Sequence, residues 1–458
     1  MNSIQNTTEK KQTLKRILKL RHLVFYGVAY ILPLTIFTTY GLATTMSHGM
    51  ISLCFVVTTT AMAFTAFSYS KMARSFPVAG STYTYVSKSM NPYVGFISGW
   101  TILMGYMLLP MLTYLVMSIY LNQAVPAIPI PVWILILIFI TAVVCYRGIE
   151  VAINVSSMIV LIQAVFIVAL FIFMIRWLTG GNGAGTFFDL NCFFNFEEFN
   201  KAGMGVPMLF STASILALSF LGFDAISTLS EEAIQPEKNV GKAIIITCII
   251  MGLFFVLITY FLTLCWPNAW NELVDPDAGS YEFMTKVAGS TMAYVFTGTY
   301  TVGCFASVVN CQTSAARILY SMGRDGILPG KIFAHIHPKH KTPSYNAIII
   351  AVISLVALFI SLVTATSLVS FGALLGFTLV NLSVVVFYYV KKKERGLNAI
   401  LSYLIAPLIG AGFTFFVWLG LDWHSKVLGF CWLGAGLIYL TIKTRFFREL
   451  PPEMSLDE

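Results

Sequence analysis

The chain alternates long apolar runs with short polar segments. A helix of about 20 apolar residues is long enough to cross a bilayer, and about twelve such runs follow one another along the 458 residues. We place them at 23–45, 51–70, 93–121, 131–146, 151–175, 204–230, 241–265, 290–316, 345–363, 366–390, 399–421 and 426–444. The pattern predicts an all-α integral membrane protein with about twelve transmembrane helices.

Two of these runs contain residues that break helices. The first run, YGVAYILPLTIFTTYG, holds Pro33, and the sixth run contains SFLGFDAIST, in which Gly222 precedes Asp224 by two positions. Five runs separate the two starting points, and an odd number of crossings inverts the second unit relative to the first. Interrupted helices at matching positions of two halves are typical of inverted-repeat transporters. The alternative is that these residues only kink or pack ordinary membrane helices.

This pattern predicts two inverted repeats of five helices with discontinuous first and sixth helices, followed by two additional helices. The predicted organisation is a cytoplasmic tail (1–22), a first repeat (23–175), an extracellular loop (176–203), a second repeat (204–390), two further spans (391–445) and a second cytoplasmic tail (446–458).

Composition and charge agree with a membrane location. Only 10% of the residues are charged and 57% are hydrophobic, whereas soluble domains carry about 25% charged residues. With the amino terminus inside, only Arg176, Lys201, Lys286 and Lys426 of the 28 basic residues fall on the outer side. Because lysine and arginine accumulate on the cytoplasmic side, both termini are predicted to be cytoplasmic, in the plasma membrane. The net charge of +8 then reflects orientation, and no nucleic-acid partner is expected.

Asp224 is the one carboxylate well inside an apolar run. A charge within the bilayer is costly unless it is paired, hydrated or protonated, and such residues usually mark a substrate or ion pathway. The sequence therefore suggests a binding site for a small molecule at the break in the sixth helix.

At these residues the chain resembles the amino acid–polyamine–organocation superfamily. The stretches FLGFDAISTLSEEAIQPEKNVGKAI and ARILYSMGRDGILP resemble its signatures, and FPVAGSTYTYVSKSMNPYVGFISGW is similar to the putrescine-importer group. The resemblance implies the two-times-five inverted-repeat fold and a substrate site between the first and sixth helices. The lining that it implies is Pro33, Leu34, Thr35, Ser219, Phe220, Gly222, Phe223 and Asp224.

The resemblance leaves the substrate class open. Putrescine importers have an aspartate where this chain has Thr38, and another where it has Gly105. A dication needs compensating carboxylates in a low-dielectric site, whereas a zwitterionic amino acid can bind to helix-end amides and carbonyls. The family likeness favours a polyamine, and Thr38 and Gly105 favour an amino acid.

The coupling ion is open as well. Proton-coupled relatives can carry a lysine in the fifth span, and the matching position here is Gln163, a neutral amide that cannot titrate. Either Asp224 carries a proton, a sodium ion binds near Gln163 and Ser307, or the protein exchanges one solute for another. No cofactor is expected beyond a coupled proton or sodium ion.

Further polar and aromatic residues have two interpretations each. Glu231 and Glu232 lie at the inner end of the sixth span. They either gate the pathway through Lys238, Lys242 or a neighbouring loop, or are hydrated anchors at the membrane boundary. The aromatic side chains of Trp100, Tyr106 and Phe223 either close over a bound substrate or only pack against neighbouring helices or anchor the membrane interface. The six histidines lie at span ends or in loops, and the eight cysteines show no metal-ligand spacing.

These observations favour a secondary transporter over an enzyme, because no nucleophile, histidine cluster or acid pair converges within the runs. We expect import of a small amine-bearing solute, an amino acid or a polyamine such as putrescine, by cation-coupled alternating access. The alternatives are an amine or amino acid exchanger and a channel.

Overall fold

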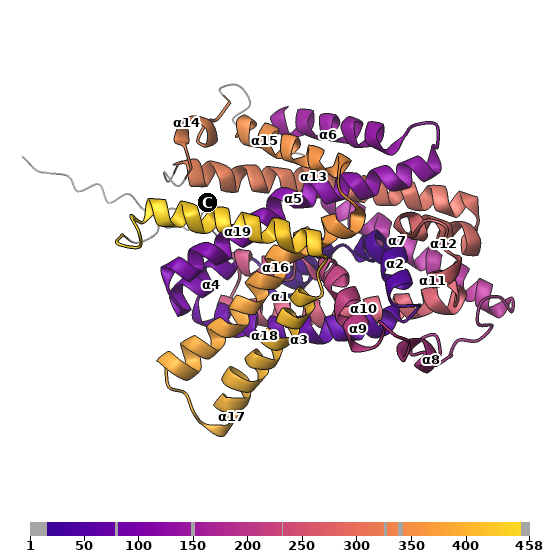
Figure 1. Cartoon of the computed structure of the whole chain (residues 1–458), viewed down its shortest axis with the longest axis horizontal. Coiled ribbons are helices and arrows are strands. Elements are labelled where there is room, and N and C mark those ends of the chain that lie inside the picture. Colours follow the sequence, from indigo (N-terminus) through magenta and orange to yellow (C-terminus); the bar gives the residue numbers. More distant parts are fainter. Residues whose placement is uncertain are drawn as a thin grey trace, which may run out of the picture.

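The computed structural model describes residues 16–77, 81–147, 152–230, 232–324, 328–337 and 342–449. Figure 1 shows a bundle of helices, most of which run side by side along the long axis of the molecule, with α4 (Ser81–Ser89) and the C-terminal end of α19 (Trp423–Lys443) toward one end. Within the described residues the only β pairing is a single bridge between Leu18 and Ala233. The all-α prediction is confirmed.

Ten of the described helices are long and apolar enough to cross a membrane, and two shorter apolar helices accompany them. The uninterrupted ones are α3 (Ile51–Ser75), α5 (Pro92–Ala124), α6 (Ile130–Arg147), α7 (Ala152–Thr179), α10 (Pro236–Cys265), α13 (Ser290–Arg324), α15 (Ser344–Ser354), α16 (Leu362–Val384), α18 (Ala406–Leu419) and α19 (Trp423–Lys443). Together with the two interrupted spans, these match the twelve predicted crossings.

The first span is interrupted at Leu32 and Pro33. Helix α1 (Leu20–Ile31) stops at Leu32, whose φ is 56°, then a 3₁₀ turn (η1, Pro33–Thr35) leads into α2 (Ile36–Met46). Proline disfavours a helical conformation in the residue before it and lacks an N–H. The Thr35 hydroxyl donates to the carbonyls of Ile31 (3.0 Å) and Leu32 (2.6 Å), and the Thr35 amide also donates to the Leu32 carbonyl (2.9 Å), so Thr35 stabilises the turn at the break.

The sixth span is interrupted around Gly222. Helix α9 (Val206–Leu216) tightens into the 3₁₀ turn η2 (Ala217–Phe220), and the chain resumes as η3 (Asp224–Leu229). Gly222 has φ +119°, and a Cβ there would lie 2.2 Å from Cδ1 of Tyr30. Only glycine fits, both in backbone conformation and against α1. The two predicted interruptions are therefore present and in contact with each other.

Helix packing follows the predicted repeat. Helix α1 packs on α10, and α9 packs on α3; likewise α5 packs on α16, and α13 packs on α7. When each of the first five spans is replaced by its counterpart among the second five, the contact of α1 with α10 becomes that of α9 with α3. In the same way, the contact of α5 with α16 becomes that of α13 with α7. This packing is what two related five-helix units require, and the boundaries assigned to them above remain predictions.

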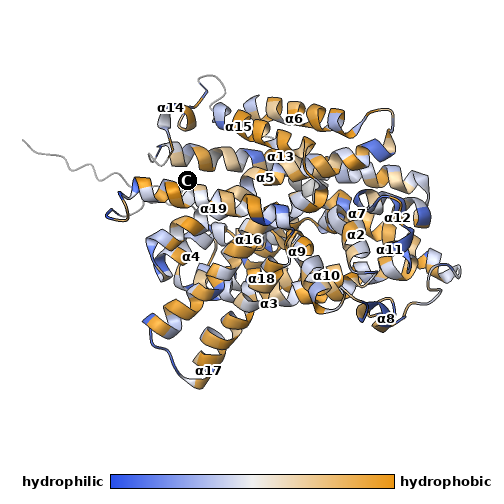
Figure 2. Cartoon of the chain, viewed as in Figure 1, coloured by the Kyte–Doolittle hydropathy of each residue, from blue (hydrophilic) through white to orange (hydrophobic). Residues whose placement is uncertain are grey.

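Polar residues lie mainly at the helix ends and in the connections, and apolar residues run along the helices (Figure 2). Large apolar side chains are exposed on the outside of the bundle, for example Phe139 (70%), Leu253 (64%) and Ile438 (64%). In lipid such side chains need no protein cover. The chain is a multi-pass membrane protein.

The predicted boundary between the ninth and tenth spans was wrong. The ninth span, predicted to reach residue 363, ends with η5 (Leu355–Leu358), and α16 begins at Leu362. The Ser361 hydroxyl accepts a hydrogen bond from the Thr364 amide (3.2 Å) and caps the new helix, as serine does at helix N-termini. Uniform apolarity across this stretch concealed that turn.

Several short helices between the spans were not predicted. On the side that we assign to the exterior these are α8 (Phe196–Phe199), α11 (Ala269–Glu272), η4 (Pro276–Ala278) and α12 (Gly279–Ala288). On the other side they are α4 and α14 (Gly330–Phe333). Helix α17 (Leu397–Ile400) is instead the first turn of the eleventh span and continues through η7 (Leu401–Ile405) into α18.

Candidate functional site

A cavity lies between the interrupted spans, with an empty volume of about 560 Å³ that includes space open to solvent. This is within the range of about 300–1,000 Å³ typical of small-molecule sites. Its walls come from α1, α4, α5, the sixth span and α16. The lining residues are Tyr30, Thr82, Ile102, Gly105, Tyr106, Leu109, Leu221, Gly222, Asp224, Ala225, Val369, Ala373 and Phe377.

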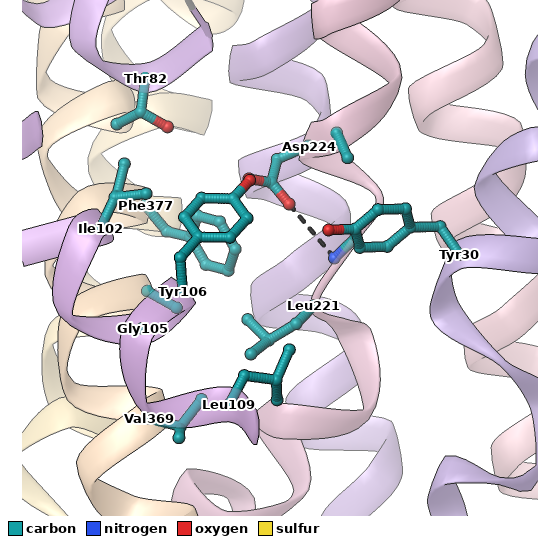
Figure 3. A pocket seen from close by; sticks show the side chains of 13 residues that line it. Tyr30, Thr82, Ile102, Gly105, Tyr106, Leu109, Leu221, Asp224, Val369 and Phe377 are labelled. Atoms are coloured by element: carbon teal, nitrogen blue, oxygen red, sulfur yellow. Dashed lines mark hydrogen bonds between the residues drawn. The ribbon is translucent and has the colours of Figure 1, made fainter. Parts of the chain in front are cut away.

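Among the described residues that line the cavity, Asp224 is the only one with a formal charge. It begins η3, and its Oδ1 accepts a hydrogen bond from the Gly222 amide at 3.2 Å. The rings of Tyr30 and Tyr106 extend toward it from opposite walls (Figure 3). Asp224 is partly exposed and lines the cavity, so a ligand in the cavity can reach its carboxylate.

The cavity has a polar region and an aliphatic region. Asp224 and the hydroxyl ends of Tyr30 and Tyr106 gather in one part, whereas Leu109, Leu221 and Val369 lie together in another (Figure 3). In the part of the chain that the structure describes, no lysine, arginine or histidine lines the walls. The site is therefore suited to a cationic group attached to an apolar chain.

The cavity lies near the middle of the long helices. Gly105 and Tyr106 are close to the midpoint of α5, and Val369 and Ala373 lie in the central turns of α16. It also reaches Thr82 of α4, at the end of the bundle where α19 ends (Figure 1).

The opposite end of the interrupted first span is closely packed. A Cβ on Gly41 would lie 2.2 Å from the carbonyl oxygen of Pro276 and 2.9 Å from Cα of Gly279. The Ser280 hydroxyl donates to the Phe37 carbonyl (2.8 Å), and the Tyr120 hydroxyl donates to the same carbonyl. This contact of α2 with η4, α12 and α5 separates the cavity from the end of the bundle that the basic residues assign to the exterior.

Three of the residues proposed from the sequence line the cavity: Gly105, Gly222 and Asp224. Of the aromatic candidates, Tyr106 also lines it. Trp100 instead stacks on Trp432 with ring centroids 4.8 Å apart, in a separate apolar cluster.

The other proposed lining residues lie around the breaks, outside the cavity wall. Pro33 and Thr35 shape the first break, and Leu34 is buried. The Thr38 hydroxyl shares a 2.6 Å hydrogen bond with the Tyr300 hydroxyl, so this position contributes to the closed outer packing.

The sixth-span candidates also pack behind the cavity. Phe220 packs on Phe255 at 5.4 Å between ring centroids, and Phe223 packs on Phe377, a lining residue, at 5.1 Å. Ser219 is buried, and its hydroxyl has no hydrogen-bond partner among the described residues.

The candidates for ion coupling lie away from the cavity wall. Gln163, on α7, is buried with its Oε1 unpartnered within the described part of the chain, and Ser307, on α13, is partly buried. Helices α7 and α13 pack together. In the ranges that the structure describes, no group of three or more His, Cys, Asp or Glu side chains could hold a metal ion.

Of the two candidate gating residues, Glu231 lies outside the described residues. The Glu232 carbonyl accepts hydrogen bonds from the amides of Ile17 (2.9 Å) and Leu18 (3.0 Å), and the Ile234 amide donates to the Leu18 carbonyl (2.8 Å). The segment before α1 is thus paired with the segment after η3, and the inner ends of both interrupted spans are tied together through backbone atoms.

Sequence reasoning missed most of the cavity wall: Tyr30, Thr82, Ile102, Leu109, Leu221, Ala225, Val369, Ala373 and Phe377. Tyr30 had a usable signal, since it lies two residues before the break at Leu32. The residues on α5 and α16 had none, because these helices are apolar on every side and their sequence does not mark the face toward the cavity.

Discontinuous helices around a site at mid-depth define a class of proteins, the secondary transporters. The profile described as "Amino acid permease" matches residues 22–428. The chain belongs to the amino acid permease family, which confirms the superfamily and the transporter class expected from its motifs.

Three relatives illustrate the range of the family. The low-affinity putrescine importer PlaP of Escherichia coli (strain K12) is 37% identical over 444 residues, covering 96% of each chain. The methylthioribose transporter of Bacillus subtilis (strain 168) is 26% identical over 468 residues, covering 95% of each. The branched-chain amino acid permease BcaP of the same organism is 26% identical over 465 residues, covering 96% of this chain and 95% of the relative.

Proposed function

We propose that this permease imports a small solute carrying an amine group, with the amine bound to Asp224. The observation that carries the proposal is that the described wall of this mid-membrane cavity contains a single carboxylate and no basic side chain. An acid there attracts an ammonium group strongly, because few other charges or waters compete with it in a low-dielectric site. Amino acids and polyamines such as putrescine are the two candidate solute classes from the sequence.

Alternating access is proposed to occur by movement of the interrupted spans against the remaining helices. The packing of α2 on η4 and α12 closes one end in this structure, and the cavity approaches the other end at Thr82. The protein is proposed to reside in the plasma membrane with both termini in the cytoplasm.

Uptake against a gradient requires a driving ion. The proposal names either a proton carried by Asp224 or a sodium ion bound near Gln163 and Ser307, whose helices are in contact. The buried and unpartnered Gln163 oxygen favours the sodium position. Exchange of one solute for another is the alternative and needs no coupling ion.

Reconstitution into liposomes tests this proposal. Radiolabelled amino acids and diamines would be offered under a proton gradient, a sodium gradient or neither, with empty liposomes as the control. We expect saturable accumulation driven by one of the two gradients. Uptake that occurs only into liposomes preloaded with solute would show exchange. A flux that does not saturate with solute concentration would contradict a carrier.

A further inference from the structure

We propose that this permease has a binding site for the headgroup of an anionic phospholipid, at the membrane boundary where the tenth and eleventh spans leave the bundle. The site is formed by the end of α3, by η6 (Val385–Lys391), which continues α16, and by η7, which leads into α18. It lies on the side that the basic residues assign to the cytoplasm. The inference does not depend on the transported solute.

The tenth and eleventh spans form a hairpin that projects from the bundle (Figure 1), with polar residues at its tip and apolar residues along both arms (Figure 2). Each arm contains a π-helical turn, η6 in one and η7 in the other, and the two turns pack on each other. Such turns are rare and often occur at functional sites. At this level the Tyr388 and Tyr403 rings stack, with centroids 4.2 Å apart and planes 5° apart.

The stacked pair is attached to the end of α3. The Tyr388 hydroxyl donates to the Lys71 carbonyl (3.0 Å) and lies 2.6 Å from the Ser75 hydroxyl. The neighbouring Phe387 ring packs on Phe76, with centroids 4.8 Å apart. These contacts bring the basic side chains of α3 and of the hairpin to the same surface.

Two lysines lie beside the stacked pair. The Lys71 Nζ is 5.3 Å from the Tyr403 ring centroid, and the Lys392 Nζ is 5.0 Å from the Tyr388 ring centroid. Neither lysine forms an ion pair with a described carboxylate. Lys71 is partly buried and lies one turn from the end of a membrane span, where a charge without a compensating anion is costly.

Aromatic rings compensate part of that cost through cation–π attraction, but they leave the ammonium N–H donors unused. Phosphate oxygens accept hydrogen bonds from such donors and supply the missing negative charge. The positive-inside rule explains why basic residues lie on this side. It does not require them to lie against stacked rings without acidic partners.

The surrounding sequence adds positive charge. Arg74 follows Lys71 on α3, which contains no acidic residue, and the connection after η6 contains Lys391, Lys393 and Arg395 with Glu394 as its one acid. An anion that approaches the two lysines therefore meets a surface with a net positive charge.

Exposed apolar side chains beside these cations favour a lipid over a soluble anion. Val390 (55% exposed) precedes Lys391, and Leu401 (52% exposed) lies two residues before Tyr403. The acyl chains of a phospholipid can cover such side chains while its phosphate binds the lysines, whereas a free phosphate leaves them uncovered. Basic sites between transmembrane helices on the cytoplasmic side bind anionic headgroups in this way.

Lipid binding to the purified full-length protein tests the inference. Phosphatidylglycerol, or phosphatidylcholine with the same acyl chains, would be titrated into the detergent-solubilised protein, and bound lipid measured by native mass spectrometry. We expect the wild type to bind phosphatidylglycerol about tenfold more tightly than phosphatidylcholine, and free glycerol phosphate not to compete. Equal binding of the two lipids would overturn the inference, and displacement by glycerol phosphate would overturn the assignment to a lipid.

The double variant Lys71→Gln/Lys392→Gln locates the site. Its control is Lys19→Gln/Lys331→Gln, which removes the same charge from two exposed lysines predicted to lie on the same side. We expect the first variant to lose most of the preference for phosphatidylglycerol and the control to keep it. Equal preference in the two variants would overturn the proposed location. Lys392→Gln alone, at an exposed position, provides the same comparison with Lys331→Gln if the double variant does not fold.

Discussion

Gly222 holds the two interrupted spans against each other at the level of single atoms. Its φ of +119° and the 2.2 Å separation between an added Cβ and the Tyr30 ring leave no room for a side chain. The same residue donates its amide to Asp224. One residue thus fixes the turn, the distance between α1 and the sixth span, and the orientation of the carboxylate.

Gly222→Ala is therefore expected to destabilise the protein and to weaken amine binding. Backbone strain of this kind costs about 1–3 kcal/mol, and the Tyr30 ring must also move. The measurements are thermal unfolding of the purified variant and its affinity for the radiolabelled amine that the wild type takes up. Gly105→Ala, with ordinary contact distances in the same cavity, is the matched control. A Gly222→Ala protein with wild-type stability and affinity would contradict this account.

The sequence identified the polar centre of the site but not its walls. Asp224 and Gly222 stood out because acids and helix-breaking glycines are uncommon inside apolar spans. Phe377 and Val369 did not, since an α-helix that is apolar on all sides has no period that distinguishes the cavity face from a packing face. Thr38 was judged a candidate from family position, yet its hydroxyl pairs with Tyr300.

At the scale of elements, His48 joins three outer segments. It lies in the turn between α2 and α3, stacks on Trp270 of α11 with centroids 4.4 Å apart, and its Nδ1 lies 2.7 Å from Oε2 of Glu198 on α8. Lys201 forms an ion pair with the other oxygen of Glu198. Lys201 and His48, in that order, hold the pKa of Glu198 below its ordinary value by hydrogen bonding to the charged form.

Linkage then predicts how this contact responds to acid. Because the pKa of Glu198 is lowered in the folded protein, the stabilisation is complete above the unfolded pKa of about 4.3 and is lost as the pH falls through the folded value. We expect the midpoint of thermal unfolding to fall with acidification in this range, and to fall less in Glu198→Gln. Glu197→Gln, on the same helix, is the control. Identical pH profiles for wild type and Glu198→Gln would contradict the assignment.

The outer seal depends on the close approach of Gly41 and Gly279. Gly41→Ala would place a Cβ 2.2 Å from the Pro276 carbonyl oxygen, and a backbone atom cannot rotate aside. We expect displacement of η4 and α12 and a loss of about 1–3 kcal/mol, as for other overpacked sites. Gly412→Ala on α18, where nothing lies within 4 Å of the added Cβ, is the control.

Opening of this seal can be measured by thiol labelling. In a Ser280→Cys protein the new thiol replaces a buried hydroxyl, so a membrane-impermeant maleimide is expected to react slowly, and faster once Gly41→Ala is added. Burial raises the pKa of the native Cys192 thiol on the outer side to about 12, which keeps it protonated and unreactive. Equal labelling rates in both backgrounds would show that the seal does not depend on this glycine.

At the scale of the whole molecule, the order of the crossings was predictable and the short outer helices were not. Span number follows from apolar length, which the bilayer fixes. Elements such as α8 and α12 are held by tertiary contacts, for example Ser280 to Phe37 and Glu198 to His48, and such contacts leave no periodic signal. The backbone pairing of Leu18 with Ala233 was likewise invisible in the sequence.

Orientation in the membrane remains a prediction from the basic residues. The positive-inside rule places Lys391, Lys392 and Lys393 in the cytoplasm and Lys201 outside. Single cysteines at 201 and 392, in a background without accessible native thiols, are expected to react with an impermeant reagent on intact cells only at position 201. Labelling at 392 in intact cells would reverse the topology.

The most direct test of the account is amine binding and uptake by Asp224→Asn, which keeps the side-chain size and removes the charge. Asp277→Asn, in η4 and outside the cavity wall, is the control, and the amount of monodisperse protein extracted from membranes verifies insertion of both. We predict that Asp224→Asn inserts normally, loses at least tenfold in affinity for the amine that the wild type takes up and no longer accumulates it, whereas Asp277→Asn behaves as wild type. Normal uptake by Asp224→Asn, with an unchanged dependence on pH, would contradict the central role assigned to this carboxylate.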